Sequence, residues 1–116
     1  MSRRSARRFE ALVADALDEL PSWVQEAMDN VAVVVEERPP ADEPELLGLY
    51  EGIARTERFD YAGALPDRIT LYRSSIEAEA GDDDEELRAI VAETIVHEVA
   101  HHFGISDERL EALGWD

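Results

Sequence analysis

The segment HEVAHHFGISD, residues 97–107, contains all three histidines of this 116-residue chain. If the segment begins as a helix, His97 and His101 lie one turn apart and point to the same side, because residues i and i+4 stack on one face. Two imidazoles on one face, with a glutamate next to the first, form a pattern that binds zinc and supplies a general base. We therefore predict that His97 and His101 bind zinc and that Glu98 takes a proton from water.

A third protein ligand is expected close to this pair, because catalytic zinc usually has three. Gly104 permits a turn, and Asp107 follows three residues later, so we predict Asp107 as the third ligand. An ordinary first-turn aspartate at a helix N-terminus is the alternative explanation of Asp107. His102 lies about 100° further round the helix than His101, so we expect it to flank the site. The other possible third ligands are His102, Glu108 and Glu111.

The helix around the motif is expected to be buried on most sides, because most of its other residues are apolar. These residues are Ile95, Val96, Val99, Ala100 and Phe103. A buried polar group without a partner costs about 1–3 kcal/mol, so histidines in this helix need a partner such as a metal. A charged helical segment packed without metal is the alternative. The spacing of the histidines, the glutamate, the glycine and the downstream acid together favour the metal site.

Hydrophobic periodicity and cap residues predict the order helix, helix, strand, strand, strand, helix, helix. We expect Ser22 and Ser106 to cap helices and Gly104 to end the long helix in a left-handed turn. The first strand is rich in valine and is expected to be buried. A loop is expected over 54–67. The expected helices are 9–20, 22–30, 84–103 and 107–113, and the expected strands are 31–35, 46–53 and 69–73.

The chain is expected to form one α+β domain over residues 1–116, with a small three-stranded sheet packed on helices. Its 45% apolar content is sufficient for a normal interior. There is no cysteine, which excludes disulfides and thiolate zinc sites, so any zinc must take nitrogen and oxygen ligands.

The net charge of −17 comes from 28 acidic and 11 basic residues, and every basic residue is arginine. Such a surface repels phosphate backbones, so we expect no nucleic-acid partner. A solvated surface explains the acidity most simply, and attraction of basic peptides into an acidic cleft is the functional alternative. No secretion signal or membrane-length apolar run is visible, so we expect a cytoplasmic protein without a membrane partner.

The chain resembles the small bacterial "minimal zincin" family of metallopeptidases. The resemblance is carried by LGLYEG at 47–52, LPDRITL at 65–71, TIVHEVAHHFG at 94–104 and the terminal segment 110–114, in addition to the motif itself. It covers roughly the last two-thirds of the chain. The H-E-x-x-H core alone is moderately specific, whereas the combination is highly specific.

The resemblance implies a reduced zincin with a three-stranded sheet, an active-site helix near the C-terminus and a cleft beneath an edge strand. An extended peptide pairs with that edge strand in zincins generally. Either 47–53 or 69–73 is the expected edge strand here. The implied zinc ligands are His97, His101 and Asp107, with Glu98 as base. Metzincins usually offer a third histidine and a methionine turn; this chain has only Met1 and Met28, so that turn is absent.

The function expected first is zinc-dependent hydrolysis of peptides or unfolded protein segments by water that Glu98 activates. A catalytically weak or inactive zincin-like binding or regulatory module is the main alternative. Hydrolysis of a non-peptide amide or ester is a third, because the same water activation serves any acyl centre. A donor to the oxyanion is also expected. Several arginines and the tyrosines Tyr50, Tyr61 and Tyr72 are available, although half-buried sheet packing is the expected role of each tyrosine.

Overall fold

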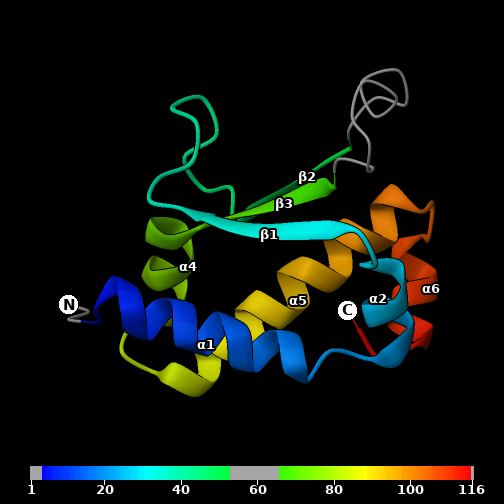
Figure 1. Ribbon diagram of the computed structural model, residues 1–116, viewed down its shortest axis with the longest axis horizontal. Helices are drawn as coiled ribbons and strands as arrows, with labels where there is room; N and C mark the ends of the chain where they lie inside the picture. Colours follow the sequence, from blue (N-terminus) through cyan, green and yellow to red (C-terminus); the bar gives the residue numbers. More distant parts are fainter. Residues whose placement is uncertain (1–3, 53–65, 116) are drawn as a thin grey trace.

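The computed structural model describes residues 4–52 and 66–115, and it arranges them as one sheet covered by helices (Figure 1). Tyr61 and most of the predicted 54–67 loop lie outside the described residues. The elements are α1 (Ala6–Asp18), α2 (Ser22–Ala27), β1 (Val31–Glu36), β2 (Gly48–Glu51), β3 (Asp67–Tyr72), α4 (Arg73–Ala80), α5 (Asp84–His102) and α6 (Asp107–Ala112).

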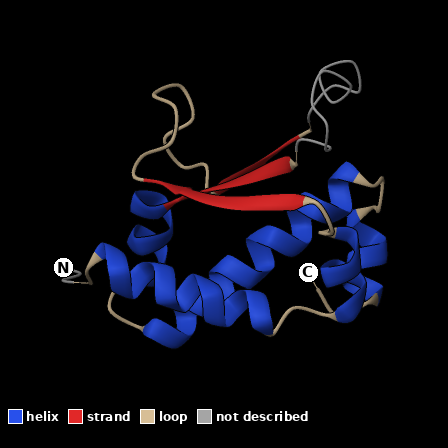
Figure 2. Cartoon of the chain, in the orientation of Figure 1, coloured by secondary structure: helices blue, strands red, loops and turns tan. Residues whose placement is uncertain are grey.

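The three strands form one layer, and the helices gather on one side of it (Figure 2). The strand order is β1-β3-β2; β1 pairs parallel with β3, and β2 pairs antiparallel with β3. The predicted α+β fold with a three-stranded sheet packed on helices is therefore confirmed. Because β3 is central, the 69–73 segment is excluded as the edge strand, and β2 is the edge strand that contacts α5.

The core lies between the sheet and the two longest helices. Phe9 and Leu12 of α1, Ile69 and Leu71 of β3, and Leu87 of α5 are fully buried. Burying a large apolar side chain stabilises the fold by about 1.5–3 kcal/mol, so this layer supplies much of the stability. Within the described residues, no helix has both the length and the hydrophobicity that crossing a membrane requires.

Two sequence expectations about burial and capping are wrong. Strand β1 is half-buried rather than buried, because it is an edge strand with only one face on the core. Its residues Val31, Val33 and Val35 pack against the core. Ser22 does not cap α2 but is its first residue, and Pro21 occupies the cap position without a side-chain hydrogen bond.

Helix α4 was not predicted, and it begins at Arg73, which the sequence placed at the end of a strand. Its sequence RSSIEAEA contains one large apolar residue, Ile76, so it carries little helical periodicity. Burial of Ile76 and Ala80 holds α4 in place, and α4 contacts α5. The formation of α4 therefore depends on tertiary contacts rather than on a local sequence pattern.

Gly48 lets β2 pack closely against α5. A Cβ atom at this position would lie 2.8 Å from Thr94 Cγ2 and 3.1 Å from the carbonyl oxygen of Thr70. Real Cβ atoms do not approach other atoms as closely as 2.8 Å. Gly48 therefore sets the distance between strand and helix.

We predict that Gly48→Ala lowers the free energy of unfolding by about 1–3 kcal/mol, because the added methyl group overpacks this contact. Urea denaturation measures the change. Adding Thr94→Ser, which removes the nearest methyl group, should recover part of the loss in a double-mutant cycle. A Gly48→Ala protein as stable as the wild type would contradict the account.

Asp84, in the first turn of α5, joins the N-terminal segment to this helix. Its carboxylate accepts hydrogen bonds from Arg4 Nε at 2.9 Å and Arg8 Nη2 at 2.8 Å. These bonds, from Arg8 first and then Arg4, hold the pKa of Asp84 below its usual value. A carboxyl group with a lowered folded-state pKa stabilises the fold above its ordinary pKa, and that contribution is lost as the pH falls through the folded-state pKa.

We predict that Asp84→Asn lowers the Tm at pH 7 and that its difference from the wild type shrinks only below about pH 4. Thermal denaturation across the pH range measures this. Asp82→Asn is the matched control, because Asp82 is exposed and forms no ion pair within the described part of the chain. If the Tm difference between Asp84→Asn and the wild type stays unchanged at acid pH, the stabilisation by Asp84 is not ionic.

Candidate metal centre and adjoining cavity

The end of α5 is built by a turn and a cap that bring Asp107 back toward the helix. Phe103 is the C-cap of α5, and Gly104 follows with a φ of 77°. The amide of Ile105 donates to the carbonyl of Ala100 at 2.8 Å. Ser106 caps α6 by accepting a hydrogen bond from the amide of Arg109. The left-handed turn at Gly104 and the cap at Ser106 are as the sequence predicts.

His97, His101 and Asp107 form a group of donors at this end of α5. Each offers one ligand atom, and these atoms all lie within 4.8 Å of one another. His101 Nε2 is 2.8 Å from Asp107 Oδ1, and the ring centroids of His97 and His101 are 5.9 Å apart. The structure thus brings together the three residues that the sequence predicts as ligands. His102, Glu108 and Glu111 are not in this group.

One polar atom of the donor group lacks a partner that a metal ion could supply. Nε2 of His97 is buried and has no hydrogen-bond partner in the structure as described. A buried polar atom without a partner costs about 1–3 kcal/mol, and a metal bond would satisfy it. Two imidazoles and one carboxylate are also a donor set that zinc accepts.

The protonation of Asp107 suits metal binding. Its hydrogen bond with His101 holds the pKa of the Asp107 carboxyl below its usual value. The carboxylate form, which is the form that binds a metal, is therefore favoured. Asp107 and His101 are both exposed, so an ion can reach them from solvent.

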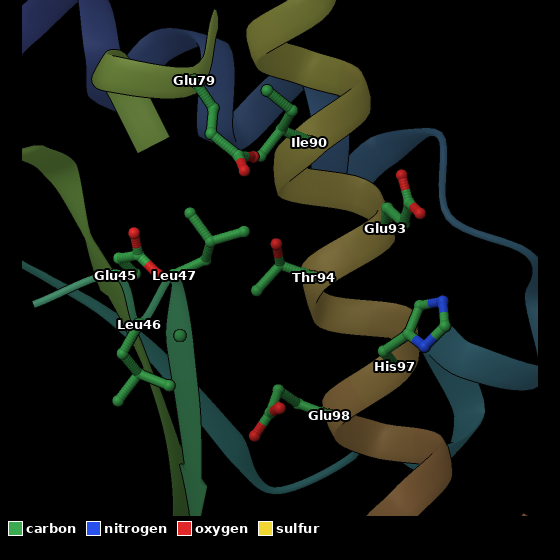
Figure 3. Close-up of a pocket in the computed structure, with 10 residues that line it drawn as sticks. Glu45, Leu46, Leu47, Glu79, Ile90, Glu93, Thr94, His97 and Glu98 are labelled. Carbon is green, nitrogen blue, oxygen red and sulfur yellow. The ribbon is translucent and has the colours of Figure 1, made fainter. Parts of the chain in front are cut away.

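Glu98 faces the edge strand from the same turn of α5. Its Oε1 accepts a hydrogen bond of 3.0 Å from the backbone N–H of Tyr50 in β2. The side chain is half-buried and points toward the strand in Figure 3. The contact joins residues 48 positions apart in the sequence, so no local pattern indicated it.

His102 lies against the edge strand rather than in the donor group. Its ring stacks on Tyr50, with centroids 4.0 Å apart, and its Nε2 is 3.9 Å from Asp67 Oδ2. The hydroxyl of Tyr50 donates to the same oxygen at 2.7 Å. Asp67 therefore links Tyr50 to His102, a role the sequence analysis missed because nothing near Asp67 in the sequence signals it.

The last turn of α5 is more open than the sequence suggested. Ile95, Val96, Val99 and Ala100 are fully buried, as expected. Phe103 is 56% exposed, so the expectation that it is buried with the other apolar residues of this helix is wrong. The helix ends there and the chain turns away into α6, which leaves this face of the site accessible.

A cavity of about 500 Å³ adjoins the site between β2, α4 and α5 (Figure 3). His97 and Glu98 line it at the motif, and Gly48 and Leu47 line it on the strand side. Tyr50, Tyr72 and the arginines of the described residues do not line it. Tyr72 is instead buried in the sheet, and burial raises the pKa of its hydroxyl.

Comparison with known proteins agrees with this architecture. A family model described as "Zincin-like metallopeptidase" matches residues 28–115. The solved structure of a conserved hypothetical protein from Thermo thermophilus is similar to this chain, with a TM-score of 0.57 and 26% identity. The similarity covers 95% of this chain and 97% of that one. No curated protein matches the sequence.

The family match spans the strands, the motif helix and α6, so it includes every element that builds the donor group. The family resemblance found in the sequence is thereby confirmed. This chain belongs to the zincin-like metallopeptidase family.

Proposed function

We propose that this protein is a zinc-dependent hydrolase of peptide bonds. Two observations on one group carry the proposal: ligand atoms of His97, His101 and Asp107 lie within 4.8 Å of one another, and His97 has a buried Nε2 without a hydrogen-bond partner. Glu98 and a cavity of about 500 Å³ adjoin that group. Membership of the zincin-like metallopeptidase family supports the same chemistry.

His97, His101 and Asp107 are the residues that would hold the zinc. When bound, zinc supplies Lewis acidity toward a carbonyl oxygen and lowers the pKa of water to about 7. The three side chains offer two imidazole nitrogens and one carboxylate, which leaves a position for water or substrate. His102 is assigned no ligand role, because it stacks on Tyr50 instead.

Glu98 is the residue that moves the proton. Its carboxylate takes a proton from the attacking water and delivers it to the leaving amine. In the structure one carboxylate oxygen is held by the Tyr50 amide, which leaves the other oxygen free of that bond. The edge strand therefore fixes the orientation of the base, and the helix fixes its distance from His97.

The substrate is proposed to be an extended peptide or an unfolded protein segment. Strand β2 lies at the edge of the sheet and against α5, so a peptide added to this edge would pass the motif. The location of β2 beside the cavity supports this binding mode.

A second function, binding without turnover, is favoured by one observation. The carboxylate of Glu98 already accepts a hydrogen bond from the Tyr50 amide, so the base is engaged by the protein itself. A module that binds metal or peptide but hydrolyses slowly would have this feature. Measurement of peptide hydrolysis by the zinc-loaded protein distinguishes the two functions.

We predict that the protein purified without chelators holds close to one zinc per chain, and that His97→Ala lowers this at least tenfold, because one ligand is lost. Elemental analysis of dialysed protein measures the content. His102→Ala is the matched control and should keep its zinc, since His102 is outside the donor group. Equal zinc in wild type and His97→Ala would exclude the site.

We further predict that Glu98→Gln lowers the rate of peptide hydrolysis by at least about 100-fold while zinc stays bound, because the base is lost and the ligands are kept. Cleavage of a mixed peptide library, followed by mass spectrometry, measures the rate. Glu10→Gln on α1, with the same change of charge, should be as active as wild type. If the fully zinc-loaded wild type cleaves nothing, the binding module replaces the peptidase.

A further inference from the structure

We propose that the cavity beside Glu98 selects a substrate residue with a long cationic side chain, arginine or lysine. The inference rests on the proposed function, because it assigns the cavity to the same peptide substrate. It is carried by the elongated shape of the cavity, by the apolar side chains that line it, and by the carboxylates around it that have no partner in the described residues.

The cavity is elongated along α5. Ile90, Thr94 and Glu98 line it and recur every fourth residue, so they share one face of the helix. Ile90 and Glu98 are eight positions apart, which corresponds to about 12 Å along the helix. In Figure 3, Glu79 of α4 and Glu98 lie toward opposite ends, with Leu47 and Thr94 between them.

Apolar groups line the cavity between Glu79 and Glu98. Leu47 lines it from the residue before β2, Ile90 lines it from α5 near Glu79, and Gly48 contributes no side chain. A side chain with an aliphatic stem can pack along such a wall while its charged end reaches polar groups. Arginine and lysine have this construction, whereas aspartate and glutamate would bring a like charge toward Glu79 and Glu98.

Three of the four carboxylates that line the cavity are unpaired. Glu45, Glu79 and Glu93 are exposed, and their carboxylates form no ion pair or hydrogen bond within residues 4–52 and 66–115. Glu77, on the same helix as Glu79, is instead 3.0 Å from Arg73 Nε and 3.9 Å from Arg4 Nη1. The arginines near α4 thus bind Glu77 and leave Glu79 available to a ligand.

These carboxylates do not form a metal site of their own. In the described part of the chain, the donors that converge within 4.8 Å are those of His97, His101 and Asp107. The cavity carboxylates are distributed along its length instead. Charge complementarity over that length favours an organic cation on a flexible stem over a small inorganic ion.

The experiment measures binding of matched peptides to the zinc-loaded Glu98→Gln protein, which keeps the ligands but lacks the base. Four peptides differ only in a central arginine, lysine, norleucine or glutamate, and calorimetry gives each Kd. We expect the arginine and lysine peptides to bind about tenfold more tightly than the norleucine peptide, and the glutamate peptide to bind most weakly.

A second pair of variants separates the cavity from the general negative charge. Adding Glu79→Gln should weaken arginine-peptide binding about threefold and leave norleucine-peptide binding unchanged. Adding Glu10→Gln on α1 instead gives a protein of the same net charge as Glu79→Gln, and it should change the binding of neither peptide. Three results would each overturn the inference. The arginine and norleucine peptides could bind equally well, Glu79→Gln and Glu10→Gln could change the Kd of the arginine peptide equally, or no peptide could bind.

Cleavage of the same peptides by the wild type tests the proposed function separately. Selective binding by Glu98→Gln without any wild-type cleavage supports the cavity assignment and overturns the peptidase. Cleavage of all four peptides at equal rates supports the peptidase and overturns the cavity assignment.

Discussion

Where β2 crosses α5, Gly48 faces Thr94, and there is no space for a side chain between them. This close approach places the Tyr50 amide within hydrogen-bond distance of Glu98 and closes one wall of the cavity. A larger residue at position 48 would move the strand away from the helix. The orientation of the proposed base therefore depends on packing one turn away from it.

The motif helix serves the core and the site with different faces. Its fully buried residues, among them Val96 and Val99, fix the helix against the sheet and the other helices. His97 and Glu98 lie between Val96 and Val99 in the sequence but are half-buried at the cavity, and His101 is exposed. A rigid helix supported on its apolar side is thus a suitable platform for ligands that must hold one geometry.

The parts of the structure that sequence reasoning predicted correctly depend on local spacing. The proximity of His97, His101 and Asp107 follows from an i, i+4 pair and a glycine turn, all within eleven residues. The long helix and its cap at Ser106 follow from the same kind of local rule.

The features that were missed depend on contacts between distant segments. Helix α4 has too few apolar residues to be visible without α5, and β1 is half-buried because it is an edge strand, which composition does not encode. The bond from Tyr50 to Glu98 and the link from Asp67 to His102 also join segments far apart in the chain. No periodicity within either segment indicates these contacts.

X-ray absorption spectroscopy at the zinc edge tests the central claim most directly, because it reads the ligands of the ion in solution. The account predicts a four-coordinate ion with two imidazole nitrogens and oxygen donors at about 2.0–2.2 Å. A spectrum with one imidazole or none, or with six oxygen donors, would show that His97 and His101 do not hold the metal together.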